Sequence, residues 1–330
     1  MRKRIHILAM GGTIAGRAGD SAATTGYQAG AMGIEELVAA VPQVKEIAEI
    51  TGEQLAAIDS KDITAAEQLK LAGRVRDLLL KGDVDGIVVT HGTDTMEESA
   101  YLLDLLHFAD KPVVFTGAMR PATALSADGP LNLLDAVRVA ASDTARDRGV
   151  LVVLNNTIHS ARFVTKISTT AVETFQSPLG GAVGAVNDGA VIFYHDAELH
   201  HLPNALRVSE KLTAQRELPY VPIFYGHSDD DGRLVKWGAE NGAKGIVYAG
   251  MGNGSIPVRV ETELAAAAEK GILVIRATSS ACGMVTKAEE SYEQAGFIAS
   301  GLLNPRKARL LLQVSISCSI SPAEWQKFLA

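Results

Sequence analysis

Two apolar runs in this chain end in glycine and are followed at once by threonine, and this repeated pattern limits the possible folds most. Residues 5–10 lead into Gly11-Gly12-Thr13, and residues 86–90 lead into His91-Gly92-Thr93. An apolar run that stops at glycine is typical of a buried parallel strand leaving its sheet. Ligands of an open α/β sheet bind beyond the carboxyl ends of its strands. We therefore expect Thr13 and Thr93 at the mouth of one site, where the glycines expose backbone N–H groups.

The first glycine turn does not match the known phosphate-binding patterns. A dinucleotide fingerprint needs glycine at its first, third and sixth positions, but the third position counted from Gly11 is Thr13. A P-loop needs lysine and then serine or threonine after its last glycine, whereas Arg17 and Ala18 follow Gly16. A plain strand-to-helix turn with Thr13 as the helix cap stays open as an alternative.

The second turn carries more polar groups than a helix cap requires. Thr95 with Glu98 fits a capping box before the helical segment 97–108. One capping residue is enough for a helix, so Thr93 and Asp94 remain unexplained by this interpretation. Their place after a second strand favours a functional site.

Strand-like and helix-like segments alternate along most of the chain. Strand-like runs at 112–116 and 150–154 follow the two above, and helix-like segments lie at 65–80, 97–108 and 129–141. This alternation is typical of a parallel sheet with helices on both faces. The rhythm is lost near 195–218 and resumes at Val221. We predict an α/β protein with a larger flavodoxin-like N-terminal domain (1–195), a linker (196–218) and a smaller C-terminal α/β domain (219–330).

Composition narrows the range of partners. The 330 residues are 47% hydrophobic, which suits two domains with sizeable cores. The net charge is −7 and no long basic run occurs, which argues against nucleic acid or an acidic membrane as a partner. No segment is long enough to span a membrane.

The first residues and the rare side chains bear on compartment and metal content. Residues 1–4 resemble the start of a signal peptide, but the apolar stretch after them stops at Gly11 with no cleavage pattern. We expect a cytoplasmic protein, with a periplasmic mature form as the alternative. Cys282 and Cys318 occur without a CxxC motif, so we expect thiols and no disulfide. His200-His201 lacks an HExxH glutamate and is interpreted as surface or linker, so no metal site is predicted.

The polar residues near the predicted strand ends form an inventory for covalent catalysis. Thr13, Ser60 and Thr93 supply hydroxyls, Asp94 and Glu289 supply carboxylates, and Lys166, in an irregular segment after 150–154, supplies an amine. A hydroxyl attacks well only with a base beside it and N–H donors for the oxyanion. A lysine serves as that base when burial lowers its pKa.

Two motifs carry a resemblance to a known family. Met-Gly-Gly-Thr-Ile-Ala-Gly at 10–16 and Thr-His-Gly-Thr-Asp-Thr at 90–95 resemble the two signature patterns of the bacterial L-asparaginase family. The type II branch, which includes dual glutaminase-asparaginases, is the most similar. Blocks at 117–120, 126–129, 250–254 and 303–305 resemble the family in the same order, so the likeness runs from residue 5 nearly to the C-terminus.

The resemblance implies an amidohydrolase that converts L-asparagine to L-aspartate and ammonia, with weaker activity on L-glutamine and with no metal or cofactor. Thr13 matches the nucleophile that attacks the side-chain amide carbon. Tyr27, in the glycine-rich lid at 17–33, matches the tyrosine that closes against it. Thr93, Lys166 and Asp94 match a second cluster that positions water and activates a hydroxyl.

The same resemblance implies how substrate is bound. Ser60 matches the serine that holds the α-carboxylate, Asp94 the carboxylate that binds the α-ammonium, and Ala118 the position whose carbonyl receives the amide nitrogen. Asn253 and Glu289 match residues that complete the site of a neighbouring subunit, in a homotetramer built from two close dimers. The remaining residues predicted to line the pocket are Gly12, Asp59, Lys61 and Gly92.

The chain departs from the family pattern at a few positions. Lys61 stands where glutamine or glutamate is usual, and Asp59 where a small residue is usual. The segment 277–286 lacks a second arginine that is common there, and the cysteine pair of some periplasmic members is absent. These departures bear on substrate preference and compartment. The other function class that suits two α/β domains is a non-catalytic amino-acid sensor or binding protein.

Overall fold

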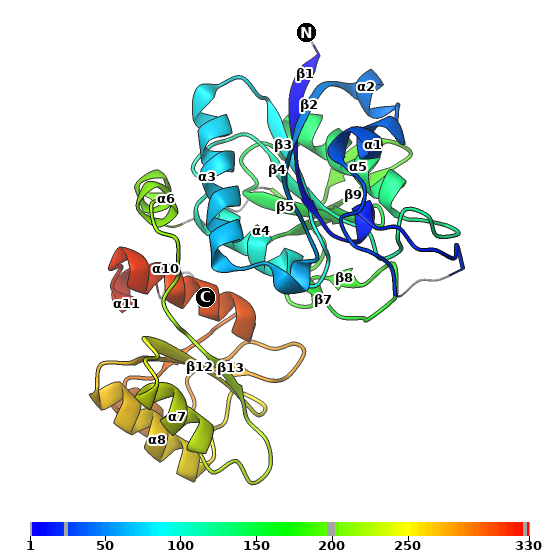
Figure 1. Cartoon of the computed structure of the whole chain (residues 1–330). Coiled ribbons are helices and arrows are strands. Elements are labelled where there is room, and N and C mark those ends of the chain that lie inside the picture. Colours follow the sequence, from blue (N-terminus) through cyan, green and yellow to red (C-terminus); the bar gives the residue numbers. More distant parts are fainter. Residues whose placement is uncertain (1, 23–25, 197–201, 203, 326–328, 330) are drawn as a thin grey trace. The chain divides into compact units, whose positions relative to one another are not determined.

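Eight strands form the main sheet of the first of two compact units, Met1–Thr213 and Ala214–Ala330 (Figure 1). The computed structural model describes residues 2–22, 26–196, 202, 204–325 and 329. The strand order is β10-β9-β6-β5-β4-β3-β1-β2. The strands are β1 (Lys3–Gly11), β2 (Ala48–Ile58), β3 (Gly86–Thr90), β4 (Val113–Thr116), β5 (Val150–Leu154), β6 (Thr157–Ser160), β9 (Gly184–Asn187) and β10 (Ala190–Phe193).

Five of these strands run parallel, in the order β2-β1-β3-β4-β5. This is the flavodoxin-like order, in which the chain changes direction across the sheet between β1 and β3. The three remaining strands extend the sheet in antiparallel fashion. These strands follow residue 154, in the region that the sequence analysis interpreted as irregular. Each strand is short, so its signal in the sequence is weak. A separate antiparallel pair joins β7 (Thr165–Lys166) to β8 (Phe175–Gln176).

Helices cover both faces of this sheet (Figure 1). Helix α5 packs on β1, β3, β4 and β5, with α1 and α2 on the same side. On the other side lie α3 and α4. The helices are α1 (Ile34–Ala39), α2 (Val44–Ile47), α3 (Ala65–Lys81), α4 (Met96–Leu105), α5 (Gly129–Ala141) and α6 (Ala205–Thr213), with 3₁₀ turns η1 (Thr13–Ala15), η2 (Ser60–Asp62) and η3 (Asp143–Ala145).

Alternate residues of the central strands face the two helical layers. Ile5, Ile7 and Ala9 of β1 are buried with Val88 and Val114 in the core cluster that includes α1, α2 and α5. Because both faces are covered, β3, β4 and β5 are buried at every position, as parallel strands in α/β proteins usually are. The strands therefore end in a rigid edge from which the following turns emerge.

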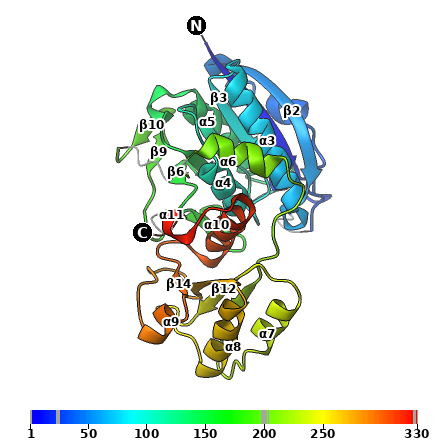
Figure 2. The same cartoon turned by 90° about the vertical axis from the view of Figure 1, so that its left-hand side faces the viewer.

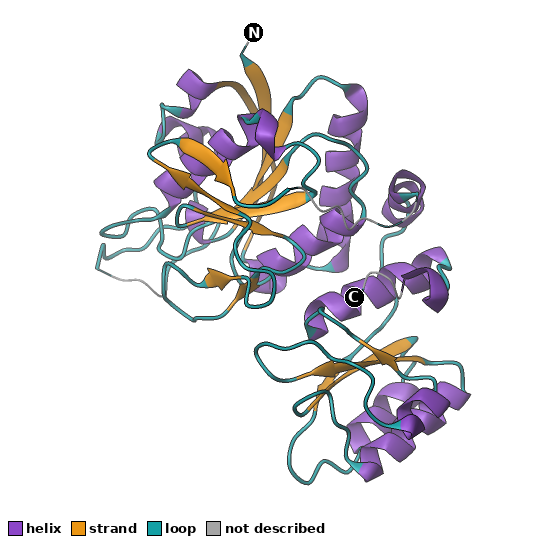
Figure 3. Cartoon of the chain, turned by 180° about the vertical axis from the view of Figure 1, so that it is seen from behind, coloured by secondary structure: helices purple, strands orange, loops and turns teal. Residues whose placement is uncertain are grey.

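The second unit is a smaller sheet of four parallel strands in the order β11-β12-β13-β14, visible from behind in Figure 3. Helices α7 and α8 cover one face, and α10 covers the other (Figure 2). The side chain of Leu312 on α10 lies against Gly245 on β12. The elements are β11 (Ile223–Tyr225), α7 (Arg233–Glu240), β12 (Gly245–Gly250), α8 (Val258–Glu269), β13 (Leu273–Thr278), α9 (Glu290–Gln294), β14 (Ile298–Ala299), α10 (Pro305–Cys318) and α11 (Pro322–Trp325).

The predicted linker at 196–218 is not a linker throughout, because it contains helix α6, which packs on α3 in the first unit. The helix buries Ala205, Val208, Ser209 and Leu212. This spacing of three and four residues makes one apolar face, which the scattered charges around it concealed. The two units divide after Thr213. His200 and His201, which the sequence placed on the surface or in the linker, lie outside the described residues.

Candidate active site

Two glycines bring the ends of β1 and β3 into direct contact. A Cβ atom added to Gly12 would lie 2.3 Å from the Cα atom of Gly92, so neither position leaves room for a side chain there. Gly12 also has a φ of +81°, a conformation that favours glycine. The contact falls at the β1/β3 crossing, where flavodoxin-like sheets bind ligands. It places the residues that follow, Thr13 and Thr93, at one edge of the sheet.

The Gly12 N–H is not exposed to a ligand, contrary to the expectation from sequence. It donates to the carbonyl oxygen of Ile58 at 3.0 Å, at the end of β2. The Gly12 carbonyl accepts from the N–H groups of Ala15 and Gly30. The glycine turn is therefore held by the protein itself, and this donor is already engaged and does not face an oxyanion.

Ser60 lies on the other side of Gly92. A Cβ atom added to Gly92 would fall 2.6 Å from the Ser60 hydroxyl oxygen. That oxygen accepts the backbone N–H of Asp94 at 3.1 Å, and Ser60 is 1% exposed. Because the hydroxyl accepts in this bond, its own proton stays available for a substrate carboxylate.

The Thr13 hydroxyl pairs with the phenol of Tyr27 at an oxygen–oxygen distance of 2.5 Å. Thr13 is 6% exposed and begins the η1 turn, whose cap is Gly12 and not Thr13 as the plain-turn alternative required. The Tyr27 ring packs on Gly16, which has no Cβ to displace it. Two backbone bonds between Arg17 and Gln28 close the loop that carries the tyrosine.

A second cluster joins Thr93, Lys166 and Asp94. The Lys166 ammonium donates to the Thr93 hydroxyl at 2.9 Å and to the Asp94 carboxylate at 2.6 Å. The Lys166 side chain, on β7, is 15% exposed, whereas that of Asp94 is 54% exposed. The lysine is therefore buried on the hydroxyl side and paired on the solvent side. The second oxygen of Asp94 can accept a further cation.

The turn after β4 lies against both threonine segments. A Cβ atom on Gly117 would approach the Thr93 methyl group at 3.5 Å, while Ala118 and Ile14 both contact Gly129. Ala118 is fully buried in the core cluster that contains Ile14. The structure thus brings Ala118 to the same edge as the two hydroxyl clusters.

Lys61 pairs with the acidic residues beside it. Its ammonium lies 2.6 Å from the Asp59 carboxylate and 3.6 Å from that of Asp62, and the side chain is 62% exposed. The hydrogen bond to Asp59 raises the pKa of Lys61 above its ordinary value. The unusual cation at this position is accompanied by an equally unusual anion.

The imidazole of His91 is completely buried between the two signature residues Thr90 and Gly92. Its Nδ1 lies 2.7 Å from the Gly92 carbonyl oxygen, and its ring lies 5.8 Å from that of Phe115. Burial lowers the pKa of His91 to about 4. The ring is therefore neutral at physiological pH, with Nδ1–H as the donor to Gly92.

Asn253 and Glu289 are fixed within the second unit. The Asn253 amide exchanges two hydrogen bonds with Thr286, at 3.1 and 2.9 Å. The Glu289 carboxylate accepts the phenol proton of Tyr292 at 3.2 Å. The side chain of Arg276, 2% exposed, binds the carbonyl oxygens of Asn253 and Thr286. The segments that carry Asn253 and Glu289 are therefore connected.

Comparisons with known proteins cover nearly the whole chain. The family model described as "Asparaginase, N-terminal" matches residues 4–199, and "Glutaminase/Asparaginase C-terminal domain" matches residues 220–329. The chain belongs to the asparaginase family. The resemblance seen in the sequence is thereby confirmed, as is the α/β fold class.

Three members of the asparaginase family illustrate the degree of similarity. L-asparaginase 2 of Bacillus subtilis is 45% identical over 98% of this chain and 85% of its own length. A protein of Haemophilus influenzae named probable periplasmic L-asparaginase is 45% identical over 98% of this chain and 91% of its own. The crystal structure of a protein named probable cytoplasmic L-asparaginase, from Campylobacter jejuni, superposes with a TM-score of 0.92, at 42% identity and 99% coverage of both chains.

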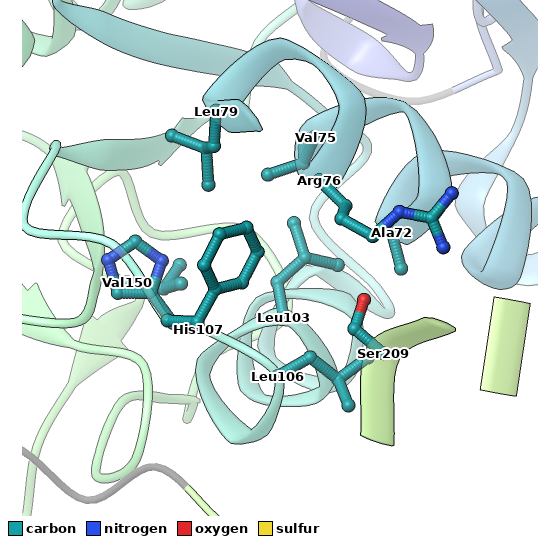
Figure 4. A pocket seen from close by; sticks show the side chains of 10 residues that line it. Ala72, Val75, Arg76, Leu79, Leu103, Leu106, His107, Val150 and Ser209 are labelled. Carbon is teal, nitrogen blue, oxygen red and sulfur yellow. The ribbon is translucent and has the colours of Figure 1, made fainter. Parts of the chain in front are cut away.

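One cavity of this asparaginase-family chain lies away from the threonine edge. It is 10 Å³ in volume, room for about one water molecule, and is lined by α3, α4 and α6. In Figure 4, Val75, Leu79 and Leu103 point into it, while the Arg76 guanidinium points away. It is too small for an amino acid. Among the described residues, no group of three or more His, Cys, Asp or Glu side chains is placed to bind a metal.

No helix among the described residues has the length and apolar character that crossing a bilayer requires.

The sequence interpretation missed two residues that shape the site. Thr95 does not form the expected capping box; its hydroxyl donates to the Ser60 carbonyl oxygen at 2.8 Å and ties η2 to α4. Asp128 precedes α5 but caps nothing there, and accepts the N–H groups of Met119 and Arg120 instead. Both are short polar residues at helix starts, where the sequence alone favours a local cap. Only the neighbouring turns reveal the other partner.

Proposed function

We propose that this chain hydrolyses the side-chain amide of L-asparagine to give L-aspartate and ammonia, with weaker activity on L-glutamine. The observation that carries the proposal is the meeting of two buried hydroxyls, Thr13 and Thr93, with the Lys166–Asp94 pair at one edge of the sheet. Membership of the asparaginase family supports it, and the description of the C-terminal family model includes glutaminases.

The first half of the reaction makes an ester on Thr13. The Thr13 hydroxyl oxygen attacks the amide carbon, its proton passes to the departing nitrogen, and ammonia leaves. Tyr27, 2.5 Å from the hydroxyl, is placed to take and return that proton as the bonds change. The carbonyl of Ala118 receives the amide N–H groups and orients the leaving nitrogen.

The second half uses the Thr93 cluster. For this step Lys166 is the neutral amine. It accepts the Thr93 hydroxyl proton along the 2.9 Å line between them, and Thr93 takes a proton from the water that attacks the ester carbon. The ammonium so formed is held by Asp94, and its proton returns to the Thr13 oxygen as the ester bond breaks and aspartate leaves. Gly12 and Gly92 are proposed to line the floor of the pocket, because they lie between the Thr13 and Thr93 clusters and carry no side chain.

The ends of the substrate bind to groups at the same edge. The Ser60 proton is donated to the α-carboxylate, and the exposed oxygen of Asp94 accepts the α-ammonium. Asp59 and Lys61 border this end as a paired couple. An amino acid amide suits this arrangement because its carboxylate meets a hydrogen-bond donor, Ser60, and its ammonium meets a carboxylate, Asp94.

The test of this proposal is ammonia release. Purified protein is assayed with L-asparagine and with L-glutamine, and the amino acid product is measured alongside. We expect one aspartate for each ammonia, and a lower rate with glutamine. An amino-acid sensor or binding protein would bind asparagine, measured by calorimetry, and release no ammonia.

We propose further that the active form is a homotetramer of two close dimers, in which Asn253 and Glu289 complete a neighbour's site. Thr13→Val and Glu289→Ala proteins, each inactive, are dissociated, mixed and reassembled. Mixed dimers then contain one intact site, so up to about a quarter of the parent activity should return. In the control pair, Thr13→Val with Lys166→Met, both changes lie in the first unit, and no activity should return.

No recovery in verified mixed oligomers of the first pair would show that each site is built within one chain.

The compartment is proposed as cytoplasmic, because the similar Campylobacter jejuni protein is named cytoplasmic, whereas the Haemophilus influenzae relative is named periplasmic. Fractionation of the source cells, with ammonia release measured in each fraction, distinguishes the two.

A further inference from the structure

The loop after β4 is held by side chains that the proposed reaction does not use. The Asp128 carboxylate accepts the N–H of Met119 through one oxygen and the N–H of Arg120 through the other, both at 2.9 Å. The Asn132 amide donates to the Gly117 carbonyl at 3.0 Å and to Asp128 at 3.1 Å. These bonds fix the backbone on both sides of Ala118.

The buried partner in this network is Asn132, which is 2% exposed. Its side-chain oxygen accepts the N–H of Asn155 at 2.9 Å, directly after β5. The amide therefore ties the loop after β4 to the end of the next strand. A carboxylate held in this way has little freedom to turn, which makes Asp128 a rigid anchor for the backbone of the loop.

The geometry of the peptide bond connects the position of Asp128 to the direction of the Ala118 carbonyl. The Ala118 carbonyl and the Met119 N–H belong to one planar trans peptide and point in opposite directions. Because the N–H points to Asp128, the carbonyl is directed away from Asp128. Rotation of this peptide would cost a charge-assisted hydrogen bond, so the carboxylate sets the aim of the carbonyl.

We propose that Asp128, supported by Asn132, is a positioning residue that aims the Ala118 carbonyl at the leaving amide nitrogen. The inference rests on the proposed function, in which this carbonyl receives the amide N–H groups. It assigns to Asp128 a specific role in selecting an amide over an ester. An ester leaving group has no N–H to donate, so a correctly aimed carbonyl helps only the amide.

The experiment compares an amide with an ester that forms the same acyl-enzyme. L-asparagine releases ammonia and L-aspartate β-methyl ester releases methanol, and both leave the aspartyl group on Thr13. In Asp128→Asn, one oxygen can still accept an N–H, but the amide nitrogen cannot. We expect kcat/KM for asparagine to fall roughly 10- to 100-fold, as for other groups that orient a reacting one, while kcat/KM for the ester changes little.

The matched control is Asp85→Asn. Asp85 accepts the backbone N–H of Arg4 at 2.7 Å, at the opposite end of the strands from Thr13. This variant makes the same chemical change, the neutralisation of a carboxylate that accepts a backbone N–H, and should keep the parent ratio of amide to ester hydrolysis. Ester hydrolysis itself reports that each variant is folded, because an unfolded protein loses both activities.

Two results would overturn the inference: a parallel loss of amide and ester hydrolysis in folded Asp128→Asn, or no loss of either. If Asp128→Asn does not fold, the test uses Asn132→Ser. This variant removes the hydrogen bond that Asn132 donates to Asp128, so it should also lower the ratio of amide to ester hydrolysis. If the parent protein hydrolyses neither compound, it is the proposed function that fails.

Discussion

The two threonines at the active edge have different partners, although both follow a glycine at the end of a parallel strand. Thr13 is bonded to another hydroxyl, that of Tyr27. Thr93 is bonded to an amine that a carboxylate holds in place. Thr93 therefore has an amine and a carboxylate beside it, whereas the hydrogen-bond partner of Thr13, the predicted nucleophile, is not a strong base.

Under the proposed function, we expect the two clusters to act in different steps of the reaction. A hydroxyl that is paired with a phenol can pass its proton over a short distance, but the phenol is too weak a base to hold that proton. A hydroxyl paired with lysine can activate water or a second hydroxyl. The contact of Gly12 with Gly92 keeps the two arrangements beside each other, so they can serve successive steps on one substrate.

The largest effect should come from Thr13→Val, which keeps the shape of the side chain and removes the oxygen. We expect a fall of roughly 10³-fold or more in kcat for asparagine, with normal folding. Ammonia release measures the rate, and the thermal unfolding temperature checks the fold. Retention of more than a few per cent of the parent rate would transfer the nucleophile to Thr93 or to a directly activated water.

Lys166→Met tests the second cluster. The change removes the amine that contacts Thr93 and should lower kcat by roughly 10²- to 10⁴-fold. Because Thr13 is untouched, mass spectrometry of the quenched reaction should detect an aspartyl group on Thr13. Lys3→Met is the control, since it removes a 2.6 Å lysine–aspartate pair at the surface and should leave kcat unchanged. A Lys166 variant with full activity would show that the clusters do not divide the work in this way.

The buried His91, directly after β3, should make the folded protein less stable in acid. Burial lowers the pKa of His91 to about 4, from 6.5 in the unfolded chain, so below pH 6.5 the unfolded state binds the extra proton first. This ring should therefore cost up to about 3 kcal/mol of unfolding free energy between pH 7 and pH 4.

Denaturant unfolding at several pH values measures that loss. His91→Asn can keep a donor to Gly92 but does not titrate, so the fall should shrink in this variant. His227→Asn is the control, because exposed His227 makes the same bond to the carbonyl that follows it. An equal fall in the His91 variant and in the parent would contradict the expectation.

The smallest effect is expected from Lys61→Gln, beside Ser60. The Lys61 charge opposes the substrate α-ammonium, but Asp59 and solvent reduce its influence. We expect KM for asparagine to fall by at most about fivefold, the size typical of an exposed ion pair, with kcat little changed. The penalty for glutamine should be larger in the parent than in the variant. An unchanged or raised KM would show that Lys61 does not act on the substrate.

The sequence by itself determined the architecture around the site. Apolar, β-branched runs that stop at glycine are readable as parallel strands because burial on both faces leaves no polar alternation. The two signature motifs then indicated the family, and with it the pairing of hydroxyls, lysine and carboxylate. The antiparallel strands of the first unit and helix α6 were missed, since short strands and a single amphipathic face give weak local signals.

Only the tertiary structure decided which partner each polar group takes. The sequence indicated Thr95 as a helix cap and gave no role to Asp128, because nearby residues are the only partners that a sequence displays. In the fold, Thr95 binds Ser60 and Asp128 binds the backbone beyond Ala118. Likewise, the Gly12 N–H was expected to face a ligand but donates to Ile58 on a neighbouring strand. A polar group bonds to the suitable partner that is nearest in space. The packing of the strands, and not the order of residues along the chain, decides which partner that is.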